Sequence, residues 1–284
     1  MGSSPHDQSS LAEKNQQYWD NVSKSIFKEQ WIQDLQQQIF SHLRSNLTWL
    51  SIDASATENK KPTKMLDYAC GNGIPSKALS PYFTTCIGMD MAQSMVETYN
   101  AAAKELGLSS RQMYAIRGDL MAENVDPALL GEEMSGFDLV VICLALHHIE
   151  DSGEAIERLV ERLRVGGTML VIDWATIEEK GRGQQGEVGV EERDGEESGH
   201  RQQGAGHYHH HHNHQYPHDL REINHPAAHT VAHNSFAKEQ MAQAFESAGC
   251  GDFEFVLHEK PSSVPMIAGG QMQLFFAKGS KIRA

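Results

Sequence analysis

Cysteines are few in this 284-residue chain, and they lie far apart. The four of them, Cys70, Cys86, Cys143 and Cys250, form no C-x-x-C pair. Their spacing suggests neither a zinc knuckle nor a disulfide framework, and a reducing compartment is the simplest interpretation. No apolar run approaches the ~20 residues of a membrane-spanning helix, and the first residues resemble no secretory signal. We therefore expect a cytoplasmic protein without a membrane span, with the nucleus as an alternative location.

Basic residues are also scarce. The chain has 24 Lys and Arg residues against 38 Asp and Glu residues, which gives a net charge of -14. This balance disfavours binding to a phosphate backbone, so we expect no nucleic-acid partner. A chain of this length forms one large domain with insertions or two small ones. The spacing of the motifs described below favours one domain.

Short apolar segments alternate with helical patterns through the middle of the chain. We expect strands near residues 64–69, 85–90, 112–117, 137–143 and 168–173, helices near 75–81, 92–106, 126–133 and 153–164, and a turn at Gly166-Gly167. A terminal hairpin pair of strands near 253–258 and 271–277 completes the pattern. The alternation predicts an α/β fold with a doubly wound, Rossmann-like and mostly seven-stranded sheet.

Two helices are expected before the sheet. Ser10 and Glu13 form a capping-box pattern that opens the first helix. Apolar residues from Trp31 to Leu47 recur at three- and four-residue steps, which predicts a second, amphipathic helix. We therefore divide the chain into N-terminal helices and linker (1–63), which could cover the ligand edge of the sheet, and a main domain (64–284).

A long insertion interrupts the main domain at about residues 176–234. Its first part is acidic and glycine-rich, and eleven of the sixteen histidines lie between His200 and His233. Such a composition cannot form a core, so we expect flexibility. Clustered imidazoles can bind zinc, nickel or copper. No cysteine or carboxylate is placed to complete a tetrahedral site, and we predict no metal centre. Order is expected to resume where Ser235 caps a helix that contains Phe236.

The most informative motif runs from Met65 to Gly73 and continues at Asp90. Gly71 and Gly73 permit a sharp turn close to a ligand, and a carboxylate at Asp90 can accept hydrogen bonds from both hydroxyls of a ribose. The third glycine of a dinucleotide-binding G-x-G-x-x-G motif is absent. The pattern therefore favours a nucleotide-like ligand other than NAD.

These motifs resemble motif I and the following acid of class I S-adenosylmethionine (SAM)-dependent methyltransferases. The resemblance extends from about Lys64 to Trp174 and resumes from Phe236 to Lys278, and it is strongest to the broad group that includes ubiquinone- and menaquinone-biosynthesis methyltransferases (the methyltransferase type 11-like group). It implies SAM as the cofactor. The cofactor-binding residues that it implies are Asp67, Gly71, Gly73, Asp90, Met91, Gly118, Asp119, Leu120, Cys143 and Leu144. Each of them alone could instead be an ordinary cap or turn residue.

The resemblance assigns a role to each part of this set. Asp67 would lie near the methionine amino group, Asp90 would hold the ribose, and Asp119 would bind the adenine amino group. Met91 would lie against the adenine, and the backbone at Cys143 and Leu144 would contact the methionine portion. Ala69 departs from the family pattern, which usually has glycine there.

Histidines follow the apolar strand expected at 137–143. Imidazole is suited to removing a proton near neutral pH, so His147 and His148 are candidate catalytic bases. His233, before the last expected helix, is a further candidate. A His-His pair is nevertheless common in this family among members with unrelated acceptors, and one histidine could instead orient the loop.

Four residues are candidates for the acceptor pocket. Asp173 and Trp174 end the fifth expected strand, and Tyr18 and Trp19 lie in the first helix. Packing between helix and sheet is the alternative role for the two N-terminal aromatics. The resemblance implies in-line transfer of a methyl group from SAM to an O, N, S or C atom of a small molecule. The alternatives are a regulatory or heteromeric subunit and a protein methyltransferase, with the N-terminal helices or the insertion binding a protein partner.

Overall fold

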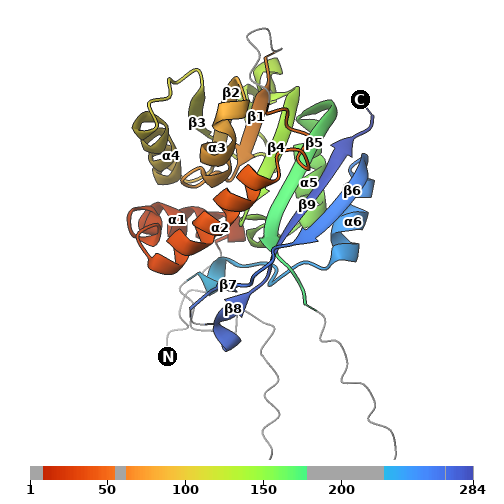
Figure 1. Ribbon diagram of the computed structural model, residues 1–284. Coiled ribbons are helices and arrows are strands. Elements are labelled where there is room, and N and C mark those ends of the chain that lie inside the picture. The colour runs from red at the N-terminus through yellow and green to blue at the C-terminus, as the bar shows by residue number, and fades with distance from the viewer. Residues whose placement is uncertain (1–8, 55–61, 178–226, 266, 284) are drawn as a thin grey trace, which may run out of the picture. The chain divides into compact units, whose positions relative to one another are not determined.

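The central feature of the computed structural model is a seven-stranded sheet with helices on both faces (Figure 1). The structure describes residues 9–54, 62–177, 227–265 and 267–283. The strands of the sheet are β1 (Lys64–Tyr68), β2 (Thr85–Asp90), β3 (Met113–Arg117), β4 (Phe137–Cys143), β5 (Leu163–Trp174), β6 (Cys250–Leu257) and β9 (Leu274–Lys281). Their order is β3-β2-β1-β4-β5-β9-β6, with β9 antiparallel to both of its neighbours. The predicted α/β, doubly wound, seven-stranded fold is confirmed.

Six α-helices lie in the described part of the chain. They are α1 (Leu11–Ile26), α2 (Gln30–Ser45), α3 (Ile74–Leu79), α4 (Gln93–Glu105), α5 (Ser152–Glu161) and α6 (Lys238–Ser247). The short 3-10 turns are η1 (Ser80–Tyr82), η2 (Pro127–Leu130), η3 (Glu132–Met134), η4 (Leu146–His148), η6 (Ala228–Thr230) and η7 (Ala268–Gly270). Two short strands, β7 (Ser262–Ser263) and β8 (Gln271–Met272), pair with each other outside the main sheet. No described helix has the length and apolarity that crossing a membrane requires.

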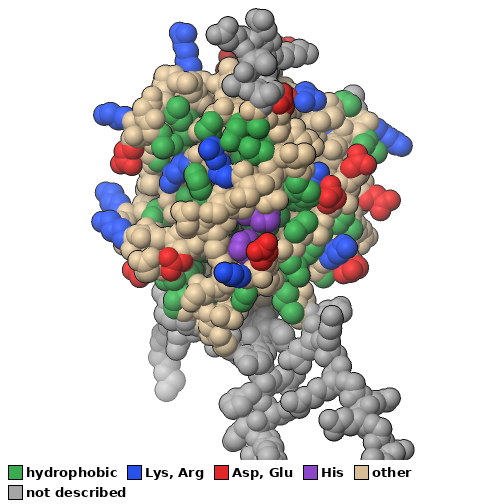
Figure 2. Space-filling view, viewed as in Figure 1, with side chains coloured by type: hydrophobic (Ala, Val, Ile, Leu, Met, Phe, Trp, Pro, Cys, Tyr) green, Lys and Arg blue, Asp and Glu red, His purple; other side chains and the backbone are tan. Residues whose placement is uncertain are grey.

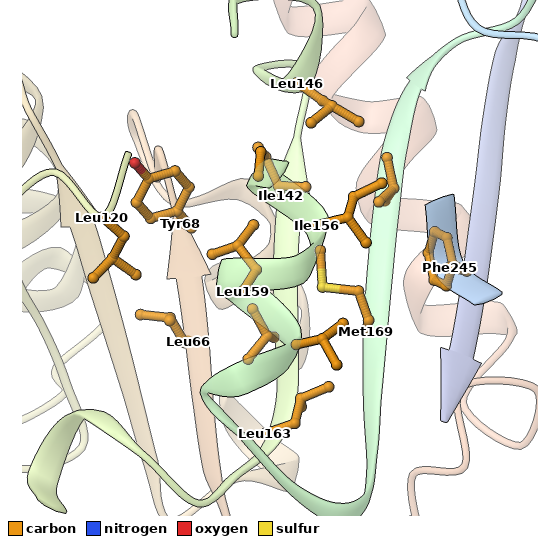
Figure 3. Close-up of a cluster of buried hydrophobic side chains, with 14 of the residues drawn as sticks. Leu66, Tyr68, Leu120, Ile142, Leu146, Ile156, Leu159, Leu163, Met169 and Phe245 are labelled. Atoms are coloured by element: carbon orange, nitrogen blue, oxygen red, sulfur yellow. The ribbon is translucent and has the colours of Figure 1, made fainter. Parts of the chain in front are cut away.

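The core has two parts because neighbouring side chains of a strand point to opposite faces of the sheet. Met65 of β1 packs in the cluster beneath α2, α3 and α4, whereas Leu66 packs in the cluster beneath α5 and α6. Figure 3 shows part of the second cluster, in which Ile156 and Leu159 of α5 lie against the sheet. Burial on both faces explains the nearly continuous apolar sequences of the central strands.

The N-terminal helices are tied to the helices of the sheet. The predicted capping box is confirmed, because Ser10 Oγ accepts from the Glu13 backbone N–H at 3.2 Å and the Glu13 carboxylate accepts from the Ser10 backbone N–H at 2.8 Å. The backbone N–H of Ser94 in α4 donates to Asp20 Oδ1 at 3.0 Å. Helix α2 packs on α3 and ends at Ser45. Helices α1 and α2 therefore lie next to the segments that follow β1 and β2.

Two expectations between the strands are wrong. The helix expected at 126–133 is replaced by η2 and η3, because Pro127 begins one short turn and Gly131 separates it from the next. The turn expected at Gly166-Gly167 lies inside β5, where the pairing with β4 shifts register between Leu163 and Thr168. The positive φ of 75° at Gly166 accommodates this irregularity.

The expected cap of the last helix is also wrong. Ala237 is the residue that precedes α6, and its side chain makes no capping bond. Ser235 Oγ instead lies 2.8 Å from Thr176 Oγ1, and Phe236 forms an isolated parallel bridge with Ala175. The chain thus extends the end of β5 before the helix begins. The acidic segment and most of the histidine-rich run (178–226) lie outside the described residues.

Candidate active site

A cavity of about 470 Å³ opens at the carboxyl ends of the parallel strands. Residues of β1, β2 and β4 line it together with residues of α1 and α2. This is the edge at which open α/β sheets bind ligands, because the loops that follow the strands converge there. On the face of the molecule drawn in Figure 2, Lys and Arg side chains are scattered among acidic and apolar ones and form no continuous basic patch on the described residues.

The turn after β1 has the sharp geometry that its glycines predict. Gly71 and Gly73 have φ angles of 50° and 76°, and Ala69 has a φ of 52°. The backbone N–H of Gly73 donates to the carbonyl oxygen of Cys70 at 2.7 Å. A Cβ at Gly73 would lie 2.7 Å from a ring carbon of Tyr99. Gly71 and Ala69 therefore border the cavity, whereas Gly73 lets the turn pack on α4.

Asp67 has one carboxylate oxygen without a partner. Its Oδ2 accepts from the hydroxyl of Ser76 at 2.7 Å and from the Ser76 backbone N–H at 3.3 Å. Its Oδ1 is buried and has no hydrogen-bond partner among the described residues. Burial raises the pKa of Asp67 to about 7. A buried oxygen without a hydrogen-bond donor loses its hydration uncompensated. Because Asp67 borders the cavity, the ammonium group of a ligand could supply this donor.

Asp90 lies on the cavity wall at the tip of β2. Its two oxygens accept from the backbone N–H groups of Gly71 and Ala92, each at 3.0 Å. These bonds fix the carboxylate, and each oxygen keeps a further lone pair for a ligand hydroxyl. Burial raises the pKa of Asp90 to about 6. Met91, the next residue, also lines the cavity.

A third carboxylate follows β3. Asp119 Oδ1 accepts from the Tyr68 hydroxyl at 2.9 Å and from the Met121 backbone N–H at 2.8 Å, and the side chain borders the cavity. Gly118 and Leu120 do not line it. A Cβ at Gly118 would lie 2.8 Å from a methyl group of Leu129, and Leu120 is buried in the core. Of the three predicted cofactor residues in this segment, Asp119 therefore lines the cavity, whereas Gly118 packs on Leu129 and Leu120 lies in the core.

Cys143 and Leu144 line the cavity at the tip of β4. Leu144 has a φ of 53°, and its backbone N–H donates to the carbonyl oxygen of Ile172 at 2.8 Å. Burial raises the pKa of the Cys143 thiol well above its usual range, so the sulfur stays protonated and is a poor nucleophile. These residues contribute shape and backbone groups to the wall.

His147 and Asp173 form a buried hydrogen-bonded pair. His147 Nδ1 lies 2.7 Å from Asp173 Oδ1, the backbone N–H of His147 donates to Asp173 Oδ2 at 3.2 Å, and the backbone N–H of Trp174 donates to Asp173 Oδ1 at 2.8 Å. His147 borders the cavity, whereas Asp173 is fully buried and does not. The expectation that Asp173 lines the acceptor pocket is therefore wrong, because its carboxylate is turned back to hold His147.

The other two histidine candidates occupy different positions. His148 lines the cavity, and its Nδ1 lies 2.8 Å from the carbonyl oxygen of Thr230. His233 does not line the cavity, because its Nε2 bonds to the carbonyl oxygen of Glu150 at 3.0 Å. The backbone N–H of His233 donates to the carbonyl oxygen of His147 at 3.0 Å. The segment that contains His233 thus supports the histidine turn through its backbone.

Asn15 is a site residue that the sequence does not reveal. This buried side chain of α1 donates to the carbonyl oxygens of Thr230 at 3.1 Å and His148 at 3.4 Å, and its Oδ1 accepts from Trp19 Nε1 at 3.3 Å. It thereby joins the first helix, the histidine turn and the 227–231 segment. An asparagine on an amphipathic helix carries no distinctive pattern, so only its position in the fold identifies it.

Two of the three aromatic candidates for the acceptor pocket line the cavity. Trp19 and Trp174 line the cavity, and the ring of Trp19 lies edge-on to that of His148 with centroids 5.5 Å apart. Tyr18 does not line the cavity. It packs edge-on against His229, and burial raises the pKa of its hydroxyl.

Comparison with known proteins assigns a family to the segment that contains the cavity carboxylates. Residues 66–171, which include Asp67, Asp90, Asp119 and His147, match the family described as methyltransferase domain. Residues 66–171 of this chain therefore correspond to a methyltransferase domain. The strand order and the N-terminal helical cover agree with this assignment. SAM is the cofactor of the family.

Two curated relatives match the methyltransferase domain. An uncharacterised methyltransferase of Schizosaccharomyces pombe is 33% identical over 116 residues, which are 40% of this chain and 39% of that protein. A ubiquinone biosynthesis O-methyltransferase of a Caulobacter species is 28% identical over 108 residues, which are 38% of this chain and 39% of that protein. The matched region therefore spans well under half the length of either relative.

A solved structure shares the fold over nearly the whole chain. Magnesium protoporphyrin IX methyltransferase from Synechocystis PCC 6803, solved with bound SAM, has a TM-score of 0.55 and 14% sequence identity, with 97% of this chain and 100% of that chain covered. At this identity the likeness shows the fold alone.

Much of the cavity wall is apolar. This part of the wall is formed by α1, α2, the β7–β8 hairpin and neighbouring segments, and its side chains are Ile26, Phe27, Trp31, Ile32, Leu35, Ile39, Val231, Val264, Ile267 and Met272. The amphipathic pattern of α2 predicted a buried face, and the structure shows that part of this face covers the cavity. We call the part of the cavity that these side chains line the apolar chamber.

Metal ligands are not assembled in the described ranges. Among residues 9–54, 62–177, 227–265 and 267–283, no group of three or more His, Cys, Asp or Glu side chains could hold a metal ion. The run from His207 to His214 lies outside these ranges.

Proposed function

We propose that this chain binds SAM and transfers its methyl group to a small molecule held in the apolar chamber. One observation carries the proposal. Three carboxylates at the tips of successive strands border a cavity that is otherwise lined by many apolar side chains. A ligand with an ammonium group, a ribose and an adenine matches these carboxylates. An apolar or aromatic acceptor matches the apolar side chains.

The polar groups of the cavity match SAM one by one. The unpartnered Oδ1 of Asp67 would accept from the methionine ammonium group. Asp90, fixed by two backbone donors, would accept from the ribose hydroxyls. Asp119 would accept from the adenine amino group and Met91 would lie against the ring, while the backbone of Leu144 would border the methionine portion.

The chamber supplies the second requirement of methyl transfer, which is alignment. An in-line displacement needs the acceptor atom close to the methyl carbon and opposite the sulfur, so a fixed geometry provides much of the acceleration. Phe27 and Trp31 give the chamber flat apolar walls. A protein acceptor would have to bring a side chain under α1 and α2 to reach the same place, which favours a small molecule.

Ligand-induced stabilisation of the purified full-length chain tests the proposal. Thermal unfolding is followed with and without SAM and its demethylated product S-adenosylhomocysteine (SAH), in EDTA so that metals bound by histidines do not contribute. Ligand at a hundred times its dissociation constant adds about 2.7 kcal/mol, which raises the midpoint of a domain of this size by roughly 5–10 °C.

A matched pair of variants makes the test specific. Asp90→Asn removes the charge at the proposed ribose site and is expected to abolish most of the shift. Asp34→Asn, an exposed position of α2, leaves it intact. No shift with either ligand in the wild-type chain would contradict the proposal and favour the alternative of a methyltransferase-fold subunit that acts through a partner.

A further inference from the structure

The pair formed by His147 and Asp173 has the geometry of a proton-accepting site. Asp173 is 0% exposed, and its carboxylate accepts from His147 Nδ1 at 2.7 Å and from two backbone N–H groups. An ionised carboxylate is an acceptor only. The proton of the neutral imidazole therefore lies on Nδ1, and the lone pair lies on Nε2.

The free nitrogen is directed at the cavity. With Nδ1 held against Asp173, Nε2 points away from that carboxylate, and it has no hydrogen-bond partner among the described residues. Backbone bonds fix the turn on its other side, because Ala232 and His233 donate to the carbonyl oxygen of His147 at 2.9 and 3.0 Å. Asp173 thus orients the ring and these bonds hold the backbone, while His147 borders the cavity.

His148 differs from His147 in the charge of its partner. Its Nδ1 lies against a neutral carbonyl oxygen, that of Thr230, at 2.8 Å. A carboxylate stabilises the positive charge that an imidazole gains on accepting a proton much better than a carbonyl does. The contact with the Asp173 carboxylate at 2.7 Å therefore favours His147 as the group that accepts a proton during a reaction.

We propose that His147 accepts a proton from the acceptor, and that Asp173 is the positioning residue that sets its tautomer. This inference rests on the proposed function and favours an acceptor whose reacting atom carries a proton, such as a hydroxyl or thiol group. The acceptor O–H or S–H proton moves to His147 Nε2 as that oxygen or sulfur forms a bond with the methyl carbon. The bond between this carbon and the SAM sulfur breaks, its electron pair stays on the SAM sulfur, and SAH leaves as a neutral thioether. The imidazolium then returns its proton to water.

The tautomer of His147 tests the first half of the proposal without any acceptor. Nitrogen-15 NMR of the full-length chain, labelled at histidine and assigned with His147→Gln, distinguishes the two neutral forms. We expect the Nδ1–H form with and without SAH, and an Nε2–H form would overturn the proposal. Because the ligand-free chain already gives the answer, failure to bind SAH would contradict the proposed function and not the tautomer.

Two probe acceptors of different acidity test the second half. Release of SAH from SAM is measured with 2-naphthol, which is protonated near neutral pH, and with the more acidic 2-naphthalenethiol. Loss of a general base costs about 100-fold or more. We expect His147→Gln and Asp173→Asn to lose at least this factor with the naphthol, to lose much less with the thiol, and to recover naphthol turnover as the pH rises.

Asp34→Asn is the control for the probe experiment and should match the wild-type chain. Equal losses with both probes and no recovery at high pH would show a purely structural role and overturn the proposal. If Asp173→Asn does not fold, His147→Gln still distinguishes the two roles. If neither probe is methylated, the NMR result on the wild-type chain decides.

Discussion

Ala69 and Leu144 follow the neighbouring strands β1 and β4, and both have left-handed backbones, with φ angles of 52° and 53°. Both residues line the cavity. Residues other than glycine rarely adopt this backbone conformation, which costs each of them roughly 1–2 kcal/mol. Such strain is found where the surrounding structure fixes a ligand site. The two strand tips that flank the proposed methionine end are therefore held in place at a cost in stability.

Replacing Ala69 by glycine should stabilise the chain. The variant relieves the left-handed strain, which stabilises the folded chain. Glycine also makes the unfolded chain more flexible, which offsets about 0.4–1 kcal/mol of that gain. We expect Ala69→Gly to raise the free energy of unfolding by about 0.5–1 kcal/mol, measured by urea denaturation. Ala101→Gly in α4 is the control, and it should destabilise by about 1 kcal/mol because its backbone is helical. Equal destabilisation by both variants would show that Ala69 is not strained.

The affinity for SAH should depend on pH. Burial raises the pKa of Asp67 to about 7 and that of Asp90 to about 6. A raised carboxyl pKa stabilises the folded chain at low pH, and this contribution is lost as the pH rises from about 4 through the folded pKa. Ligand binding has the opposite dependence, because the ammonium and hydroxyl donors of SAH need ionised carboxylates.

Calorimetric titration with SAH from pH 7.5 to 5.5 measures this dependence. We expect the affinity to fall by about 10- to 100-fold over this range. Asp67→Asn should bind SAH weakly at pH 7.5 and show a flatter profile, since one of the two titrating groups is gone. An affinity that is constant or that increases in acid would contradict the assignment of both carboxylates.

Much of the fold follows from local patterns in the sequence. The bounds of β2 and β4 agree with the expected strands, because buried parallel strands have long apolar runs bounded by turn residues. The errors occur where one residue type permits two structures. Pro127 starts a helix or a single turn, Gly166 makes a turn or an irregularity within a strand, and Ser235 caps a helix or bonds to a neighbouring strand. Tertiary contacts decide among these options.

The three carboxylates that line the cavity could be selected from the sequence because each lies within one local motif. The relationship between His147 and Asp173 could not, since it depends on the pairing of Cys143 with Ile172 that brings the tips of β4 and β5 together. A signal did exist, because His147 lies in the turn after β4 and Asp173 lies near the end of the neighbouring strand β5. Asn15 and the apolar chamber depend on how α1 and α2 lie over the sheet, and no spacing in the sequence encodes that.

Asn15 should be the residue that holds the first helix on the histidine turn. Asn15→Ala removes the side-chain donors to the carbonyl oxygens of Thr230 and His148, and the loss of these hydrogen bonds costs about 1–3 kcal/mol. Hydrogen exchange of α1 should be faster in this variant. Gln17→Ala, at an exposed position of the same helix, should leave both stability and exchange nearly unchanged. Similar exchange in the two variants would show that apolar packing alone holds α1.

The charges around the cavity should select against anionic acceptors. Six carboxylates line it, those of Asp67, Asp90, Asp119, Glu150, Asp151 and Glu154, and no Lys or Arg does so among the described residues. An anion entering the chamber would lose hydration without gaining a cationic partner. We therefore expect 2-naphthol to bind to the SAH-saturated chain at least about tenfold, or 1.4 kcal/mol, more tightly than 2-naphthoate.

Quenching of tryptophan fluorescence measures both affinities, since Trp19, Trp31 and Trp174 line the cavity. Glu150→Gln removes one of the exposed carboxylates at the cavity and should improve the binding of 2-naphthoate but not that of 2-naphthol. Glu157→Gln, on the same helix as Glu154 but away from the cavity, should change neither affinity. Equal or tighter binding of the carboxylate by the wild-type chain would mean that a cation outside the described residues reaches the chamber, and the acceptor would then carry a negative charge.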